Sequence, residues 1–449
     1  MKTKNLLVGG LAAAGLIYFI TKKASAGPPP PNGVPPGTTM GPYCFEDKSW
    51  GYVPWGQQQV AYRHVGKYDR LYIATIRPPS DPAKSGDIYV TYYDHTAKAF
   101  CPTPVKVWTM GGLANYDSTT PSLTVADDGH ILVTGGGQGV FSGHIYRSVN
   151  AEDITQWEHV SSLASGWVPV LIKDKTGKIG CFYNTQPGAE FRQYSVRLST
   201  DGGATWGDDT KIIDFADDGK TGYYQLVGQW GFDSVNNDAL LVFTRLWTMF
   251  GGYHEQYFVR YHFTDGKIYD QADHGFIAPL TYSLASSPTY KFQVLANMSA
   301  LGGCDTYNGC CGADEGGHPY IVFPVNSEVG GAVPGIFTFR FVRWSGTDWV
   351  KSDAAPANRW AMDPSTLDVV SSTNIILYAQ NSSGDEVKYH WNGSSWSSET
   401  VILKYFERSG FFTQCVPVNH KSDLQMLFCE VDFSMSSELK LFAYMALPA

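Results

Sequence analysis

Residues 178–206 read KIGCFYNTQPGAEFRQYSVRLSTDGGATW, and this stretch contains the unit from which the fold is deduced. An apolar run, KIGCFYN, is followed by a polar turn, a second run, YSVRLS, and a tight turn that closes on Trp206. Short runs rich in β-branched and aromatic residues, bounded by Gly, Asp and Asn, are typical of β-strands. The unit therefore predicts two paired strands and a turn in which an indole packs and its N–H reaches a backbone carbonyl.

The same unit recurs along the chain. Copies occupy residues 70–108, 130–157, 178–206, 239–270, 319–349, 374–396 and 424–447. Their spacing of roughly 40–60 residues is typical of β-propeller blades. No segment after about residue 51 shows the apolar periodicity of an amphipathic helix.

A ring explains why the unit repeats. A single four-stranded sheet leaves both faces and both edges bare, whereas radial stacking covers the faces. We therefore predict an all-β fold, a seven-bladed β-propeller over residues 41–449, with a blade count accurate to one. A pair of all-β sandwiches is the alternative.

The composition excludes several classes. Aromatic residues make up 14% of the chain and charged residues 17%, the reverse of a disordered protein. Lys and Arg total 33 against 42 Asp and Glu, a net charge of −9. A chain with this balance has no global basic field, so we predict no nucleic-acid partner.

The N-terminal segment differs in composition from the rest of the chain. Residues 1–26 contain a short uncharged apolar run that is followed by Lys22 and Lys23. This pattern indicates either a cleaved signal peptide or an uncleaved membrane anchor. Residues 27–40 form a Pro/Gly-rich linker, beginning GPPPPNGVPPG, which favours an extended stalk. Both alternatives place residues 41–449 outside the cytoplasm, either anchored to a membrane or secreted.

One turn carries a family resemblance. Residues 199–206, STDGGATW, match the Asp-box S-x-D-x-G-x-T-W of sialidases and other BNR-repeat propellers, and residues 148–157, SVNAEDITQW, resemble a degenerate copy. An Asp-box is a structural turn and argues for a fold rather than a chemistry. The order of segments over residues 65–350 also resembles the BNR-repeat group that includes ulvan-lyase-like polysaccharide lyases. The resemblance implies an extracellular propeller that binds or acts on carbohydrate.

The chain departs from this group at two positions. Lyases of the group carry two catalytic His, and the matching positions here are Ser118 and Gln138. β-Elimination on a uronate needs a base for the C5 proton, an acid for the leaving oxygen and a cation for the carboxylate. Neither Ser118 nor Gln138 serves as a base unaided, so we keep both as candidate substrate-binding residues. Sialidases bind a carboxylate with three Arg, one of them in an F/Y-R-I-P motif, and residues 76–79, IRPP, resemble that motif only loosely.

Four residues are candidates for a rearranged catalytic set. Arg245 ends an apolar run, and the resemblance implies that an Arg there holds an acidic substrate; the alternative is an Arg packed on aromatic rings or paired across blades. Tyr253 and His254 follow two Gly and are suited to proton exchange with a sugar, or form an exposed, inert segment. Asp117 precedes Ser118 and is either a replacement base or a turn residue.

Aromatic residues near predicted strand ends are candidates for stacking on sugar rings. They are Trp167, Tyr183 and Trp230. Packing in the core is the alternative for each of them.

A cysteine-rich segment suggests a metal. Three Cys and one His within fifteen residues fit a structural Cys₃His zinc site, namely Cys304, Cys310, Cys311 and His318. The alternative is one disulfide and one unpaired thiol. Calcium bound by Asp305, Asp314 and Glu315 is a weaker option.

Three functions fit these observations. The first is a surface-displayed propeller that binds an acidic polysaccharide or another glycan. The second is an active polysaccharide lyase, or a sialidase-like glycosidase, with a rearranged acid–base set. The third is a structural propeller that docks another protein.

Overall fold

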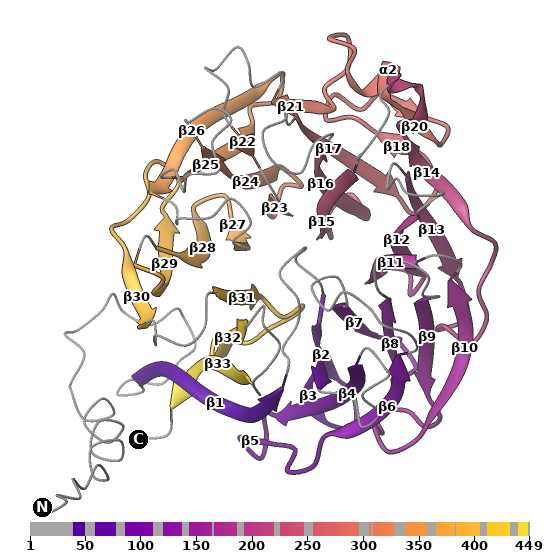
Figure 1. Cartoon of the computed structure of the whole chain (residues 1–449), viewed down its shortest axis with the longest axis vertical. Coiled ribbons are helices and arrows are strands. Elements are labelled where there is room, and N and C mark those ends of the chain that lie inside the picture. The colour runs from indigo at the N-terminus through magenta and orange to yellow at the C-terminus, as the bar shows by residue number, and fades with distance from the viewer. Residues whose placement is uncertain are drawn as a thin grey trace, which may run out of the picture.

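The structure is a computed structural model of the whole chain, shown in Figure 1. It describes residues 39–49, 59–77, 86–110, 120–136, 143–163, 166–185, 193–219, 225–246, 255–295, 305–306, 309–326, 337–356, 365–381, 383–404, 411–431 and 439–447. No helix within these ranges is long and apolar enough to cross a membrane. The predicted residues 1–26 and most of the predicted linker lie outside them.

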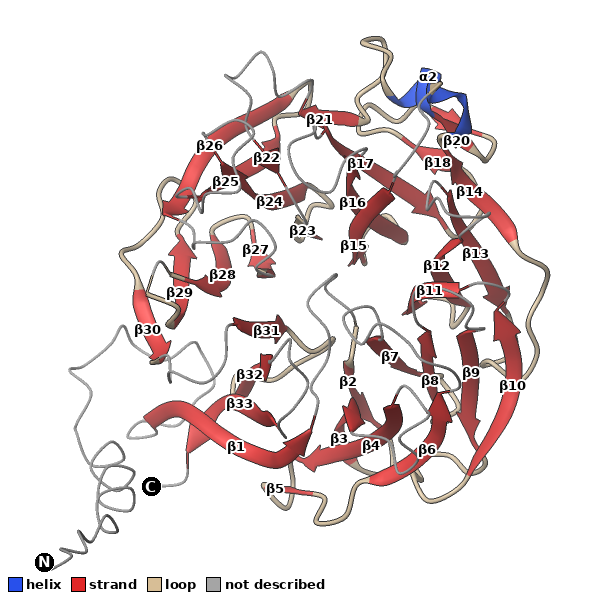
Figure 2. Ribbon diagram, viewed as in Figure 1, coloured by secondary structure: helices blue, strands red, loops and turns tan. Residues whose placement is uncertain are grey.

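The described residues form seven sheets around a common axis, which confirms the predicted all-β propeller with seven blades (Figures 1 and 2). Blade 1 contains β2 (Ala61–Val65), β3 (Asp69–Arg77), β4 (Gly86–Asp94), β5 (Ala99–Phe100) and β6 (Val105–Met110). Blade 2 contains β7 (Thr120–Val125), β8 (Ile131–Gly136), β9 (Gly143–Ser148) and β10 (Trp157–Leu163). Blade 3 contains β11 (Gly166–Lys173), β12 (Ile179–Thr185), β13 (Gln193–Ser199) and β14 (Thr210–Asp214), to which β20 (Leu280–Thr281) adds in parallel.

The remaining blades follow the same meander. Blade 4 contains β15 (Gln225–Asp233), β16 (Asp238–Leu246), β17 (Glu255–His262), β18 (Ile268–Tyr269), β19 (Gly275–Phe276) and β21 (Gln293–Leu295). Blade 5 contains β22 (Asp305–Thr306), β23 (Cys310–Ala313), β24 (Pro319–Asn326), β25 (Phe337–Trp344) and β26 (Trp349–Pro356). Blade 6 contains β27 (Thr366–Ser371), β28 (Asn374–Gln380), β29 (Glu386–Trp391) and β30 (Thr400–Leu403). Blade 7 contains β31 (Phe411–Cys415), β32 (Leu424–Val431) and β33 (Leu439–Leu447).

The two ends of the chain close the ring together. Strand β1 (Thr39–Ser49) pairs antiparallel with β33, from Thr39 opposite Leu447 to Ser49 opposite Leu439. Figure 1 shows this indigo strand beside the yellow strands of blade 7. The first two residues of β1 belong to the segment predicted as a linker. This pairing covers the edge of β33 and joins the first and last parts of the chain in one sheet.

Apolar side chains fill the spaces between blades. Phe182 of blade 3 lies 4.3 Å from the Trp230 ring of blade 4, and Trp108 of blade 1 stacks 4.7 Å from Tyr146 of blade 2. The Trp206 indole N–H donates to the Gly203 carbonyl at 3.1 Å, which confirms the predicted turn. The core is therefore divided among the blade junctions rather than held in one centre.

Polar contacts join successive blades at one end of the ring, which we call the turn face. There the first and second strands of a blade are connected, and side chains of one blade reach the next. The pairs are Glu152 with the Tyr68 N–H (2.8 Å), Asp127 with Lys173 (2.6 Å), Asp174 with Asn237 (3.0 Å), Glu315 with the Ser372 N–H (3.0 Å), and Asp368 with His420 (3.0 Å). Lys421 also pairs with Asp69, between blades 7 and 1.

The contact between His420 and Asp368 predicts a pH dependence of stability. Burial alone would lower the pKa of His420, but the hydrogen bond and charge of Asp368 outweigh it and raise this pKa. A raised folded-state pKa stabilises fully below the unfolded value of about 6.5, and this contribution is lost as pH rises through the folded-state value. We expect His420→Gln to cost on the order of 1 kcal/mol at pH 6 and less at pH 9.

Urea unfolding of both proteins at the two pH values measures this difference. The control is His390→Gln, because His390 is exposed and contacts the amide oxygen of Asn374 at 2.9 Å instead of a carboxylate. An equal cost for His420→Gln at both pH values would contradict the assignment.

Candidate functional site

Arg245 lies near the end of β16, at the end of the ring opposite the turn face. Residues 239–243 before it are apolar and buried, so the strand runs through the core before it reaches its polar end. Arg245 stands opposite Glu255 of β17 in the strand register. We call this end of the ring the Arg245 face.

The Arg245 side chain is held in a buried polar network. Its Nε lies 3.2 Å from Glu255 Oε2, and its Nη1 lies 3.8 Å from Asp218 Oδ2. The guanidinium also lies 4.2 Å from the centre of the Tyr282 ring, a cation–π contact. Only 2% of Arg245 is exposed. The predicted alternative of an Arg packed on an aromatic ring is thus present, whereas its nearest carboxylate comes from the same blade instead of a neighbouring one. A substrate carboxylate would have to enter a network that already balances the charge of Arg245.

Tyr257 fixes the other side of Glu255. The two residues are two positions apart on β17, so their side chains point to the same side of the sheet. Tyr257 donates its hydroxyl hydrogen to Glu255 Oε2 at 2.7 Å, and Gln293 of β21 donates to the Tyr257 oxygen at 3.5 Å. Burial, followed by the charge of Glu255, raises the pKa of Tyr257 well above its ordinary value. Tyr257 therefore remains a neutral donor that orients the Glu255 carboxylate.

A short helix places Tyr282 over Arg245. Helix α2 (Tyr282–Ala285) has Thr281 as its N-cap, and Asp217 accepts hydrogen bonds from the Tyr282 and Ser283 backbone N–H groups at 2.7 and 3.0 Å. Ser283 also donates its hydroxyl to this carboxylate at 2.6 Å. Burial works to raise the pKa of Asp217, but these hydrogen bonds outweigh it and lower the pKa. Asp217 follows Phe215 in a 3₁₀ turn at Ala216–Asp218, so blade 3 helps to position the ring.

Two other predicted residues occur in the sequence between the two members of the ion pair. Residues 247–254 connect Arg245 to Glu255, and they include Tyr253 and His254. Because Arg245 and Glu255 are cross-strand partners, their ion pair closes the base of this connection. The Arg245–Glu255 ion pair is buried, so it can fix the two ends of this connection but has almost no contact with solvent itself.

Several predicted site residues fall outside the described part of the chain. They are Asp117, Ser118, Gln138, Tyr253, His254 and Cys304, and for Trp167 the backbone alone is described. The strands next to Ser118 and Gln138 are described, and Thr120 of β7 stands opposite Gly136 of β8. These strand ends lie at the Arg245 face, as does the end of β16 that carries Arg245.

The two described aromatic candidates are packed in the core. Tyr183 has no exposed surface and belongs to the cluster between blades 2 and 3. Trp230 is 8% exposed and packs against the Phe182 ring in a tilted arrangement. Their rings are covered by protein, so the structure gives them the packing role that was the alternative to sugar stacking.

The predicted zinc ligands are separated where the structure describes them. Cys310 and Cys311 are consecutive in β23, so their side chains point to opposite sides of the sheet and enter two different apolar clusters. The Cys310 sulfur lies 3.5 Å from Ser365 Oγ, and the Cys311 sulfur lies 3.9 Å from the Gln229 carbonyl oxygen. This placement argues against one ion held by both thiols. Among the residues with described positions, no three His, Cys, Asp or Glu side chains are grouped so that they could hold one metal ion.

His318 and Asp314 have a local role. Asp314 Oδ1 accepts hydrogen bonds from the Gly316 and His318 backbone N–H groups, both at 2.9 Å, and closes the turn between β23 and β24. The His318 side chain is largely exposed and contacts Asp314 at 3.2 Å. Asp314 is one of the three carboxylates named in the weaker calcium prediction, and that prediction stays a prediction because the Asp305 side chain is not described. The zinc prediction as a whole stays a prediction, because Cys304 lies outside the described residues.

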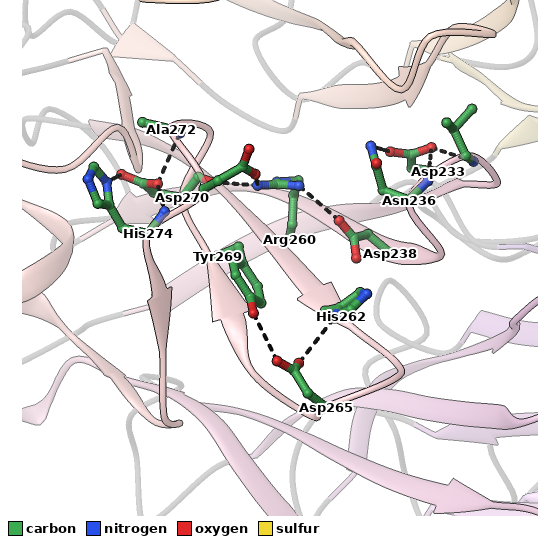
Figure 3. A network of polar contacts seen from close by, with 12 residues as sticks. Asp233, Asn236, Asp238, Arg260, His262, Asp265, Tyr269, Asp270, Ala272 and His274 are labelled. Atoms are coloured by element: carbon green, nitrogen blue, oxygen red, sulfur yellow. Dashed lines mark hydrogen bonds and ion pairs between the residues drawn. The ribbon is translucent and has the colours of Figure 1, made fainter.

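A second polar network lies on the turn face of blade 4 (Figure 3). Arg260 donates to Asp238 Oδ2 at 3.1 Å and to the Asp270 carbonyl at 2.8 Å, and it also pairs with Asp273. Burial raises the pKa of Asp238 to about 6, against the opposing charge of Arg260. Asp270 accepts from the Ala272 and His274 backbone N–H groups. These contacts hold the turn segments of blade 4 together, although Asp238 Oδ1 and Arg260 Nε are buried without a hydrogen-bond partner among the described residues.

Sequence reasoning did not find the partners of Arg245. Glu255, Tyr257, Asp218 and Tyr282 form its surroundings, and two of them come from segments outside the hairpin. The alternation of EQYFVRYH after residue 254 shows that Glu255 and Tyr257 share one side of a strand. A hairpin register for β16 and β17 would have placed Glu255 opposite Arg245.

The fold and parts of the sequence are shared with polysaccharide lyases. No family model matches the chain. A solved PL25 ulvan lyase, bound to -[GlcA(1-4)Rha3S]-, has a TM-score of 0.71 at 17% identity, over 90% of this chain and 95% of that one. The polysaccharide lyase Uly1 has a TM-score of 0.60 at 10% identity, over 92% of this chain and 100% of that one.

Two curated relatives are named as ulvan lyases. The ulvan lyase of Alteromonas sp. (strain LOR) is 22% identical over 409 residues, covering 80% of this chain and 81% of the relative. The ulvan lyase of Nonlabens ulvanivorans is 22% identical over 403 residues, covering 80% of each chain. The chain is thus similar to ulvan lyases over most of its length.

The buried ion pair makes a strong prediction about stability. Replacing Glu255 by Gln leaves Arg245 without its nearest carboxylate, and loss of one partner of a buried pair costs about 3–5 kcal/mol. We expect Glu255→Gln to lower the free energy of unfolding by about 3 kcal/mol. Chemical denaturation monitored by tryptophan fluorescence measures the change.

The matched control is Lys211→Met in the more exposed pair of Lys211 with Asp214, whose N–O distance is 2.8 Å. This change is expected to cost less than about 1 kcal/mol. A cost for Glu255→Gln no larger than that of the control would contradict the network.

Proposed function

We propose that the chain is an extracellular, surface-displayed BNR-repeat propeller that binds an acidic polysaccharide at the Arg245 face. The supporting observation is the ordered similarity to ulvan lyases over four fifths of the chain, together with the same propeller fold. A related propeller was solved with a segment that carries glucuronate and a sulfated rhamnose. The ligand class proposed here is therefore a polymer that contains uronate or sulfate groups.

Binding is favoured over catalysis by two residues. The positions that match the two catalytic His of the lyase group are Ser118 and Gln138 in this chain. A hydroxyl and an amide can each donate hydrogen bonds to sugar hydroxyls and accept hydrogen bonds from them. At neutral pH, however, neither group removes a proton from carbon unaided. A propeller with these residues keeps polar contacts to a sugar while it loses the inherited base.

Elimination is the second candidate function, and the activity named for the relatives favours it. In this reaction a base removes the C5 proton of a uronate, the electron pair forms the C4–C5 double bond, and the C4–oxygen bond breaks. The leaving oxygen then takes a proton from an acid. Asp117, Tyr253 and His254 are the candidate acid–base groups, and Arg245 would position the last two through the base of their connection.

The N-terminal segment supports the proposed location. A basic start, a short apolar run and a proline-rich stretch are what a secreted or membrane-anchored protein needs before its folded body. The stalk would hold the propeller away from a surface, where a long extracellular polymer reaches it. Docking of another protein is the alternative to glycan display.

One titration series tests the proposal. Purified chain is titrated calorimetrically with oligosaccharides of glucuronate and rhamnose 3-sulfate, and with a neutral oligosaccharide of equal length. We expect binding of the charged ligand alone, weakened by added salt because opposite charges attract less when screened. Equal heats from both ligands, or no heat from either, would contradict recognition of an acidic polysaccharide.

Ultraviolet absorbance of the same mixtures separates the two candidate functions, since elimination leaves an unsaturated uronate that absorbs. Binding without an increase in absorbance supports the binding function. An increase supports elimination, and Arg245→Ala should then abolish it whereas Arg245→Lys, which keeps the positive charge, retains part of it. An unchanged rate in Arg245→Ala would show that Arg245 has no role in elimination.

A further inference from the structure

Two histidines meet on the outer part of blade 2, away from the Arg245–Glu255 network. His144 lies on β9 and His159 on β10, the last two strands of that blade. Ser162, also on β10, stands directly opposite His144 in the register. None of these residues is needed for the proposed polysaccharide function.

A β-bulge brings the three side chains to one side of the sheet. His159 and Ser162 are three positions apart, an odd spacing that puts side chains on opposite sides of a regular strand. The register shifts between His159 and Ser161, so one extra residue is inserted there. Bulges of this kind redirect side chains and often occur beside functional sites.

The three polar atoms form a nearly equilateral triangle. His144 Nδ1 lies 3.2 Å from His159 Nε2 and 3.2 Å from Ser162 Oγ, and Ser162 Oγ lies 3.1 Å from His159 Nε2. Two metal–nitrogen bonds of about 2.0–2.1 Å at a tetrahedral angle place their nitrogens about 3.3–3.4 Å apart. The triangle therefore has the dimensions of three ligands on one side of a single ion.

The surroundings of His144 favour its neutral form. Tyr146 packs beneath the pair, with its ring centre 5.2 Å from that of His159, and Trp108 stacks on Tyr146. Burial, followed by the nearby His159, lowers the pKa of His144. A neutral ring keeps the nitrogen lone pair that a metal ion needs. The outer side is exposed, so water can complete the coordination.

We propose that His144, His159 and Ser162 form a binding site for one divalent transition-metal ion. Imidazole nitrogens select zinc, copper and nickel over magnesium and calcium. The hydroxyl of Ser162 supplies an oxygen directly or through a bound water. The ion would join β9 to β10 across the bulge and stabilise the outer edge of blade 2, since a ligand that binds the folded state raises its stability.

The test is a zinc titration of the full chain after removal of metals with a chelator. The wild-type protein should bind near one equivalent at this site, and zinc should raise its Tm. His159→Gln, at an exposed position that leaves the core intact, should bind one equivalent fewer and lose that Tm increase. Ser162→Ala should bind more weakly but keep the equivalent.

Two control variants separate this site from other histidines. His262→Gln removes a partly exposed His whose ring nitrogen lies 3.1 Å from an Asp265 oxygen, and it should leave the titration unchanged. His318→Gln tests the cysteine-rich segment, and it should retain the equivalent assigned to blade 2. Equal stoichiometry in the wild type and in His159→Gln would overturn the proposal.

Electron paramagnetic resonance of bound Cu²⁺ identifies the ligand atoms directly. One equivalent of Cu²⁺ bound to the wild-type protein should show hyperfine coupling to two imidazole nitrogens in electron paramagnetic resonance. His159→Gln should show coupling to fewer nitrogens at the same copper loading. The same two-nitrogen spectrum in both proteins would place the ion elsewhere and reject the site.

Discussion

The structure depends on covering two apolar faces of every blade. Each sheet is too thin to bury its own side chains, so each face needs a neighbour, and a row of sheets ends without a bare face only when it closes into a ring. The pairing of β1 with β33 provides that closure, because it puts both ends of the chain into blade 7. Polar contacts between turns, such as Asp174 with Asn237, then fix one blade against the next.

Closure also determines where chemistry can occur. The turn face is occupied by contacts between and within blades, including the Arg260 network of blade 4. The opposite end carries the end of β8, which Gln138 follows in the sequence, and the start of β17, which Tyr253 precedes. There the Arg245–Glu255 pair, oriented by Tyr257, closes the base of one connection. Arg245 is buried and its charge is balanced by protein carboxylates. Polysaccharide binding is therefore proposed for other residues, among them Ser118 and Gln138.

Local sequence patterns predicted the blades but not the contacts between them. Alternating apolar runs and Trp-closed turns are visible within short windows, and Trp206 forms the predicted hydrogen bond. The strand β1 was missed because TMGPYCFEDKS contains Gly, Pro and charged residues, and its partner lies at the other end of the chain. Arg245 was found at a strand end, whereas Glu255 required the hairpin register. For Cys310 and Cys311, the spacing in the sequence suggested that both bind one metal ion. In the structure they are consecutive residues of a strand, so their sulfurs lie on opposite sides of the sheet.

The central claim is that an acidic polysaccharide binds at the Arg245 face. Hydrogen–deuterium exchange of the chain, with and without an oligosaccharide of glucuronate and rhamnose 3-sulfate, tests it most directly. The account predicts slower exchange in peptides that contain the end of β8 and the hairpin of β16 and β17, with no change at the turn face. Protection confined to the turn face or to the outer strands, despite bound ligand, would contradict it.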